Sequence, residues 1–213
     1  MKTIFEKLLD LIYPPKCMFC GKIEENHICK DCIKIVKNEE KTTVLDYNVY
    51  LFEYKDKLRD KIIEYKFDDK PYLYKDFAYL FINNQKICDF LKSYDIITAV
   101  PMYYKKKMQR GYNQTELIAK ELSKKINNLE YVNLLNKIKN TNNQMNLNKE
   151  ERMQNLIGAY KINEKSKHLI TNKNVLIFDD IYTTGSTIKE CKKEIYKYNP
   201  KIIGTLTIAK DFI

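Results

Sequence analysis

The sequence predicts an α/β protein whose core is a parallel sheet flanked by helices, with a small cysteine-bearing module at the N-terminus. Three runs of apolar residues have the character of strands buried on both faces, at residues 95–101, 175–178 and 201–208. Helical patterns lie between them. After the second run, the apolar residues that fit one helix face are Ile188, Cys191, Ile195 and Tyr198.

The composition is that of a folded globular protein with excess positive charge. At 213 residues and 44% hydrophobic content, the chain has room for one sizeable core and a small appendage. The formal net charge of +10 suits a polyanionic partner such as nucleic acid or a pyrophosphate group. An AT-rich genome also produces an excess of Lys and Asn, so charge alone does not establish nucleic-acid binding.

We do not expect the first residues to form a secretion signal. Glu6 and Asp10 interrupt the apolar positions of residues 1–13, which instead suit a short amphipathic helix ended by Pro14. The sequence has no apolar run of membrane-spanning length. We therefore expect a cytoplasmic protein.

Two C-x-x-C pairs follow, with eight residues between them. Cys17 and Cys20 form the first pair, and Cys29 and Cys32 form the second. Each pair directs two sulfurs at one point, and four thiolates make the tetrahedron that zinc favours. Disulfides are the alternative, but nothing directs the chain to an oxidising compartment. A closed four-Cys site predicts structural zinc, with His27 as a loop residue or a replacement ligand.

These features predict three parts. Residues 1–40 form the N-terminal helix and zinc module, residues 41–55 a connecting hairpin, and residues 56–213 the main domain. At the start of the main domain we expect helices over residues 57–67 and about 72–91.

A basic loop follows the first buried strand, which Pro101 stops. It carries Arg110 and the lysines at 105–107, and a helix is expected over residues 115–126. Ligands of open α/β sheets bind beyond the carboxyl ends of the strands, which is where this loop begins. Arg110 is therefore a candidate to clamp pyrophosphate oxygens, and the alternative is a solvated basic turn.

A polar stretch over residues 139–148 follows a predicted strand at 131–138. It has almost no apolar anchor, and order is expected to return over residues 150–155. A long polar loop in a compact domain is often a lid over a site, and a plain surface loop is the alternative.

The most informative stretch comes at residues 175–187. Two carboxylates, Asp179 and Asp180, end the apolar strand and precede a small polar loop at the start of a helix. The loop consists of Thr183, Thr184, Gly185, Ser186 and Thr187. Such a loop offers N–H and hydroxyl donors to a phosphate, and the carboxylates suit ribose hydroxyls or a hard cation. It lacks the Gly-Lys-Ser/Thr ending of a Walker loop. The alternative is a buried strand followed by a capped helix.

These thirteen residues resemble the phosphoribosyl-pyrophosphate (PRPP) binding motif of type I phosphoribosyltransferases. The resemblance implies that Asp179 and Asp180 hold the ribose hydroxyls, that residues 183–187 wrap the 5'-phosphate, and that Mg2+ accompanies PRPP. Purine-salvage members carry an Asp where this chain has Thr183, so hypoxanthine or guanine salvage is not expected.

The order of motifs over nearly the whole chain resembles the ComF family. The family's pattern includes the four-Cys knuckle, Arg110 with Gly111, Tyr112, Asn113 and Gln114, then Gln144, Arg152 and Asn155, and the PRPP motif; Lys66 and Phe67 resemble a further family stretch. The resemblance implies a type I phosphoribosyltransferase fold, a zinc module and a role in DNA uptake during natural transformation. Its implied partners are single-stranded DNA, a DNA-uptake helicase and recombination proteins.

Two functional hypotheses remain open from the sequence. In the first, the protein is a phosphoribosyltransferase in which Arg110 holds pyrophosphate and a lid that includes Gln144 and Arg152 excludes water. In the second, it is a non-catalytic PRPP sensor or an adaptor for single-stranded DNA or proteins, with some of its 17 tyrosines as stacking platforms.

Overall fold

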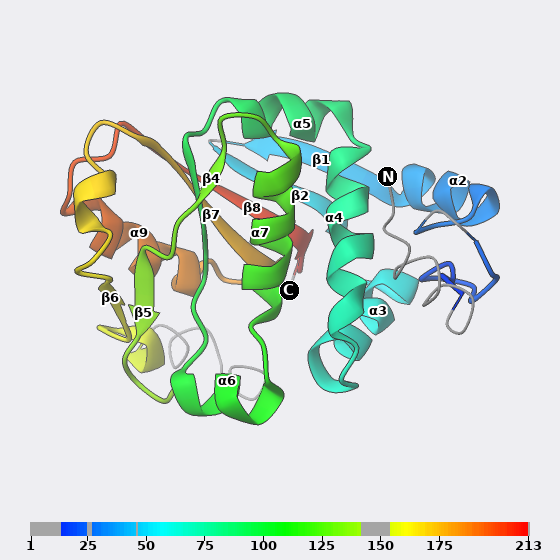
Figure 1. Ribbon diagram of the computed structural model, residues 1–213, viewed down its shortest axis with the longest axis horizontal. Coiled ribbons are helices and arrows are strands. Elements are labelled where there is room, and N and C mark those ends of the chain that lie inside the picture. The colour runs from blue at the N-terminus through cyan, green and yellow to red at the C-terminus, as the bar shows by residue number, and fades with distance from the viewer. Residues whose placement is uncertain (1–13, 25–26, 46, 142–153, 213) are drawn as a thin grey trace.

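The structure is a computed structural model that describes residues 14–24, 27–45, 47–141 and 154–212 (Figure 1). A six-stranded sheet runs through it in the order β1-β2-β8-β7-β3-β4. Its strands are β1 (Glu40–Leu45), β2 (Asn48–Glu53), β3 (Ile96–Ala99), β4 (Glu130–Tyr131), β7 (Asn174–Tyr182) and β8 (Ile202–Lys210). All neighbours pair in parallel except β1 and β2, which form an antiparallel hairpin at one edge. The expected α/β fold is confirmed.

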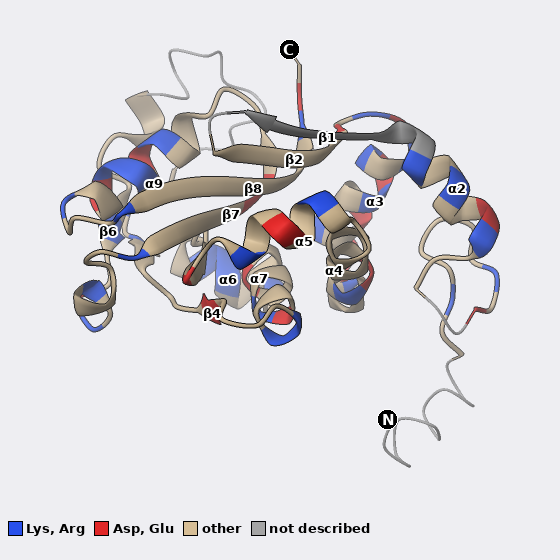
Figure 2. Cartoon of the chain, turned by 90° about the horizontal axis from the view of Figure 1, so that it is seen from above, with Lys and Arg blue, Asp and Glu red and all other residues tan. Residues whose placement is uncertain are grey.

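Helices cover both faces of this sheet. They are α2 (Lys30–Glu39), α3 (Asp56–Phe67), α4 (Tyr74–Ile82), α5 (Gln85–Lys92), α6 (Tyr104–Arg110), α7 (Gln114–Lys125) and α9 (Ser186–Tyr196). Figure 2 shows α4, α5 and α7 together on one side of the sheet. A separate two-stranded ribbon pairs β5 (Leu135–Lys137) with β6 (Tyr160–Ile162), and short 3-10 turns lie at Pro71–Leu73 and Lys167–Leu169.

Strand β7 is buried on both faces. Leu176 and Phe178 pack into the cluster that contains α4 and α7, whereas Val175 and Ile177 pack into the cluster that contains α9. Successive side chains of a strand point to opposite faces, so an unbroken apolar run packs into the apolar clusters on both faces of the sheet. This is why the run at residues 175–178 predicted a central parallel strand.

Strand β7 extends further than the sequence predicted. The two carboxylates were expected where the strand ends, but Asp179 pairs with Thr207 and Tyr182 with Lys210 on β8. Strand β8 carries a long apolar run and offers backbone partners over its whole length. The sheet ladder therefore continues through polar residues that local pattern alone would place in a loop.

Three other expected elements are corrected. The helix expected over residues 72–91 breaks where Asn84 caps α5, its side chain accepting a hydrogen bond of 3.0 Å from the Ile87 N–H. The basic loop is helix α6, which ends at Gly111 with φ of 80°. The strand expected over residues 131–138 divides into β4, which pairs with β3, and β5, which pairs with β6.

The cysteine module packs against the sheet domain. Cys17, Met18 and Ile28 are buried in the same apolar cluster as Phe77 and Phe81 of α4. The hairpin expected between module and main domain is present as β1 and β2, and β2 joins the main sheet beside β8. The helix expected within residues 1–13 and most of the expected lid lie outside the described residues. Among the residues that are described, no helix is long and apolar enough to span a bilayer.

Candidate functional site

A cavity of about 500 Å³ opens at the carboxyl ends of the parallel strands. Val100 and Pro101 line it from the end of β3, Asp179 and Asp180 from β7, and Asp211 from the residue after β8. Ligands of open α/β sheets bind at this edge because the turns between strands and helices converge there. The expected location of the site is therefore where the structure has its cavity.

The two carboxylates of β7 have different surroundings. Burial raises the pKa of Asp179 to about 7, and the neighbouring charge of Asp180 adds to this. The Asp180 N–H donates a hydrogen bond of 2.9 Å to Asp179 Oδ1, which opposes the rise. Asp180 itself pairs with Lys66, whose Nζ lies 2.8 Å from Oδ2. Both carboxylates carry acceptor oxygens, but Asp179 has a raised pKa whereas Asp180 is paired with a lysine.

The loop at residues 183–187 wraps one end of the cavity. Thr183, Gly185, Ser186 and Thr187 line it. Thr184 is not among the lining residues, and its Oγ1 lies 2.8 Å from Ser186 Oγ. Helix α9 begins at Ser186, so its first N–H groups lie at this loop. Free N–H groups, hydroxyls and the positive end of a helix dipole together favour a phosphate.

Gly185 determines the shape of this loop. Its φ of 74° is left-handed, and a Cβ there would run into the ring of Tyr182. Any other residue would meet both backbone strain and this clash.

Three lysines line the cavity. Lys106 belongs to the basic segment expected at this edge of the sheet, whereas the sequence assigned no site role to Lys66 or Lys137. Lys66 comes from the end of α3 and Lys106 from α6, where its Nζ donates to the Thr141 carbonyl at 3.3 Å. Lys137 comes from β5, and its Nζ lies 5.4 Å from the centre of the Tyr160 ring. Burial lowers the pKa of Lys137, and the nearby charge of Lys106 adds to this. No local sequence pattern marks Lys137, because its position depends on the pairing of β5 with β6.

The segment after α6 is bonded to the end of β3. The Asn113 Nδ2 and Thr115 Oγ1 groups donate to the Val100 carbonyl at 3.1 and 3.0 Å. Gln114 lies between them, lines the cavity and is buried, and its Oε1 has no hydrogen-bond partner among the described residues. A buried amide oxygen without a partner is uncommon in folded proteins.

The remaining predicted site residues lie elsewhere. Arg110 is not among the residues that line the cavity; its guanidinium carbon lies 5.3 Å from the centre of the Phe67 ring, and Phe67 does line it. The candidate lid residues Gln144 and Arg152 lie outside the described residues. Thr141, from the expected lid segment, lines the cavity.

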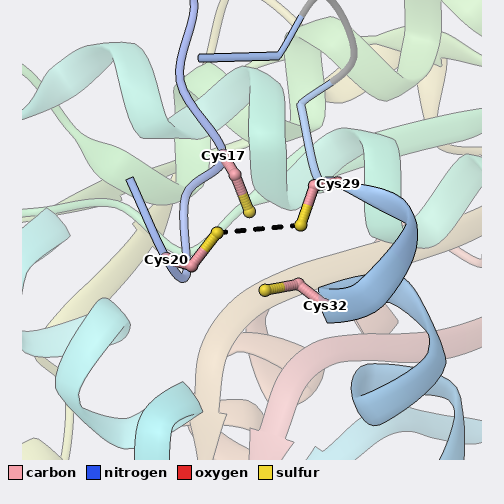
Figure 3. Close-up of side chains that lie close together, drawn as sticks. All are labelled: Cys17, Cys20, Cys29 and Cys32. Carbon is pink, nitrogen blue, oxygen red and sulfur yellow. Dashed lines mark hydrogen bonds between the residues drawn. The ribbon is translucent and has the colours of Figure 1, made fainter. Parts of the chain in front are cut away.

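The four cysteines of the two C-x-x-C pairs converge (Figure 3). Their sulfur atoms all lie within 4.8 Å of one another, and Cys20 Sγ is 3.7 Å from Cys29 Sγ. A tetrahedral zinc with bonds of about 2.3 Å to sulfur separates its ligands by about 3.8 Å, whereas a disulfide requires about 2.05 Å. The group therefore fits zinc, and the thiols are free.

The electrostatics of the cysteines suit a metal site. Burial acts to raise the pKa of Cys17, but N–H groups of Cys29, Cys20 and Phe19 lower it to about 7. Burial and the neighbouring thiols raise the pKa of Cys32 well above its usual range. A cation that takes the place of the protons relieves this crowding.

His27 is not part of this cluster. Its Nδ1 lies 2.6 Å from Oδ1 of Asp76 on α4. It therefore joins the module to the sheet domain.

This sheet, its carboxylate and phosphate-loop cavity, and the four-Cys cluster define a type I phosphoribosyltransferase-like protein with a structural zinc module. The phosphoribosyl transferase domain family matches residues 113–211, and the double zinc ribbon domain family matches residues 8–42. These two matches, together with the relatives described next, support a ComF family protein.

Similar proteins agree with this assignment. Competence protein F of Haemophilus influenzae is 28% identical over 201 residues, covering 92% of this chain and 85% of that protein. Competence protein ComFC of Streptococcus pneumoniae is 28% identical over 194 residues, covering 91% and 80%. DNA utilization protein YhgH of Escherichia coli is 28% identical over 96 residues, covering 45% and 40%.

Proposed function

We propose that the chain binds PRPP with Mg2+ in this cavity and serves a ComF-type role in DNA uptake. The observation that carries the first part is that Asp179, Asp180 and the loop at residues 183–187 line one cavity at the carboxyl edge of the sheet. A sugar phosphate requires acceptors for its hydroxyls and donors for its phosphate, and both are present on adjoining turns of chain.

Each group has a distinct task in this proposal. Asp179 and Asp180 accept the ribose hydroxyls, and the loop with the start of α9 holds the 5'-phosphate. Lys106 and Lys137 face the pyrophosphate, with Arg110 behind Phe67 as a further cation. Mg2+ supplies positive charge to the pyrophosphate oxygens and is held with PRPP by the carboxylate edge of the cavity. The phosphoribosyl transferase domain match at residues 113–211 supports this assignment.

The DNA-uptake role rests on the relatives. Two of them are named competence proteins and match most of the chain, and a third is named a DNA utilization protein. The partners in this proposal are single-stranded DNA, a DNA-uptake helicase or a recombination protein, and the place of action is the cytoplasm.

Isothermal titration with PRPP and Mg2+ tests the proposed ligand. Wild-type protein should bind, and Asp180→Asn should weaken binding at least tenfold because a carboxylate acceptor is lost. Asp89→Asn is the matched control: Asp89 pairs with Lys92 at 3.0 Å on the exposed face of α5, away from the cavity. A folded, zinc-loaded wild type that does not bind PRPP would overturn the proposal.

A second hollow favours an adaptor role as a second candidate function. It measures about 350 Å³, adjoins the phosphate loop at Tyr182 and Gly185, and contains three lysines and Tyr196. Among the described residues, no carboxylate is within ion-pair distance of its lysines, Lys189, Lys192 and Lys193. Lysines beside exposed aromatic rings suit single-stranded nucleic acid.

Two assays separate the candidates. Pyrophosphate release from PRPP that requires an added amine or base would establish transfer. Fluorescence anisotropy with labelled single-stranded DNA, compared between wild type and the triple Lys→Met variant of the second hollow, measures the adaptor role. Equal DNA affinity in both proteins would exclude this hollow as the DNA site.

A further inference from the structure

Tyr182 belongs to the walls of two hollows. The cavity at the carboxyl edge of the sheet and the second hollow share three lining residues, Tyr182, Gly185 and Ile188. The Tyr182 ring packs on Gly185, where a Cβ would come within 2.7 Å of the ring carbon Cζ. The Gly185 carbonyl accepts a hydrogen bond of 2.9 Å from the N–H of Lys189, which lines the second hollow. The phosphate loop therefore contributes to both hollows.

A lysine held among aromatic rings adjoins Tyr182. Lys210, at the end of β8, pairs with Tyr182 in the strand ladder, and its Nζ lies 6.0 Å from the centre of the Tyr182 ring. The same Nζ lies 5.5 Å from the centre of the Tyr50 ring and 4.6 Å from that of Phe212. The Tyr50 and Phe212 rings meet edge to face, with their centres 5.9 Å apart. Contacts with ring faces leave an ammonium its N–H donors for an anion.

The second hollow together with Tyr50, Lys210 and Phe212 forms one lysine–aromatic surface. It combines the three lysines of the second hollow with Lys210, and its Tyr196 and Phe212 side chains are each 58% exposed. Lysines attract phosphates, and exposed rings stack on unpaired bases. A double helix keeps its bases inside the stack, where these rings would not reach them. The surface therefore suits a single strand.

A strand on this surface and a ligand phosphate in the cavity would meet the same part of the chain from two sides. The phosphate would contact the loop at residues 183–187 and the start of α9, whereas the lysines of the second hollow lie on the following turns of the same helix. Like charges repel over distances up to the Debye length, about 10 Å at 0.1 M ionic strength. Two anions that both contact Tyr182 or Gly185 are expected to lie within this range.

We propose that single-stranded nucleic acid on the lysine–aromatic surface and PRPP in the cavity weaken each other's binding. The inference rests on the proposed function and deepens it, because it makes PRPP a ligand that releases the strand. Coupling between two binding sites is reciprocal, so the factor by which the strand weakens PRPP binding equals the factor by which PRPP weakens strand binding.

The test is the PRPP dissociation constant of zinc-loaded protein at rising concentrations of an oligothymidine of about twelve nucleotides. Isothermal titration measures it at constant salt and with Mg2+ in constant excess over both ligands. The constant should rise at least fivefold and then reach a plateau, since the two ligands occupy different sites. Fluorescence anisotropy of the labelled oligonucleotide, without and with saturating PRPP, should give the same factor.

Two variants place the strand on the surface. Lys210→Met and Phe212→Ala should each weaken oligonucleotide binding at least fivefold, and they should leave the PRPP dissociation constant without DNA unchanged because neither residue lines the cavity. Lys92→Met is the matched control, with DNA affinity and coupling as in wild type. Lys92 is an exposed lysine of α5, which packs on the face of the sheet opposite α9.

The possible failures are distinguishable. If both ligands bind but the PRPP dissociation constant stays the same or falls with DNA, the inference alone is overturned. A rise without a plateau would show that DNA enters the cavity itself, and wild-type DNA affinity in both variants would place the strand elsewhere; either result overturns the inference. PRPP binding without DNA binding overturns the inference together with the adaptor role. Absence of PRPP binding overturns the proposed function, and the inference with it.

Discussion

His27 Nδ1 lies 2.6 Å from Oδ1 of Asp76, so the loop between the two cysteine pairs is bonded directly to helix α4. The His27 ring also lies 5.3 Å from the Tyr79 ring, between ring centres. Asp76 is a buried carboxylate, and burial raises its pKa against the opposing effect of His27. The cysteine module is therefore in direct contact with the sheet domain.

Replacement of His27 by Ala should destabilise the protein and leave zinc in place. The change leaves a buried carboxylate without its partner, at a cost of about 1–3 kcal/mol in the free energy of unfolding. Urea unfolding with zinc analysis on the same sample measures both effects. Loss of zinc in His27→Ala would instead identify His27 as a ligand.

Replacement of Cys29 by Ser should release zinc and destabilise the sheet domain as well as the module. Cys29 belongs to the four-sulfur cluster and is buried in the same apolar cluster as Phe77 and Phe81 of α4. A structural zinc contributes directly to folding, so a lower melting temperature of the whole protein is expected. Cys88→Ser is the control, because Cys88 lies on α5 outside the sulfur cluster and should keep zinc. Unchanged metal content in Cys29→Ser would contradict the assignment.

Gly185→Ala should cost more stability than Gly111→Ala, although both glycines have left-handed backbones. Their φ values are 74° and 80°, but a Cβ at Gly111 meets no atom within 4 Å, whereas at Gly185 it meets the Tyr182 ring. The strain alone costs about 1 kcal/mol, and the clash adds to it at Gly185. Urea unfolding of both variants gives the comparison. Equal losses would show that the Tyr182 ring moves away freely.

Asp179→Asn should stabilise the ligand-free protein at pH 8 and have little effect at pH 4. The pKa of Asp179 is raised to about 7 in the folded state, mainly by burial, above its unfolded value of about 3.9. A raised folded pKa contributes stability that is present below the unfolded pKa and is lost as pH rises through the folded pKa. The loss thus falls between about pH 4 and 7, and Asn avoids it, with a gain on the order of 1–4 kcal/mol at pH 8.

Denaturant titrations of wild type and Asp179→Asn across this pH range measure the difference. A difference that does not change with pH would show that Asp179 is ionised in the folded protein throughout. Asp89→Asn serves as a comparison, because Asp89 is an exposed carboxylate.

Local chemistry predicted much of the fold. The helix expected over residues 57–67 is α3, and the hairpin expected within residues 41–55 corresponds to β1 and β2. The unbroken apolar run at residues 175–178 predicted a central strand because only a strand covered on both faces tolerates it. The predictions were wrong where strand pairing sets the bounds of an element. Strand β7 continues because β8 pairs with it, and residues 131–138 divide between two sheets because β4 pairs with β3 and β5 pairs with β6.

The sequence by itself determined which groups bear the chemistry: four cysteines at zinc spacing, two carboxylates, and a hydroxyl-rich loop at the start of a helix. These are short-range patterns, and their geometry follows from turns and helix ends within a few residues. Only the tertiary structure decided that Lys66 meets Asp180, that His27 bonds Asp76, and that Lys137 faces the cavity. Such contacts join segments far apart in the chain, so they depend on how the helices pack on the sheet and not on any local pattern.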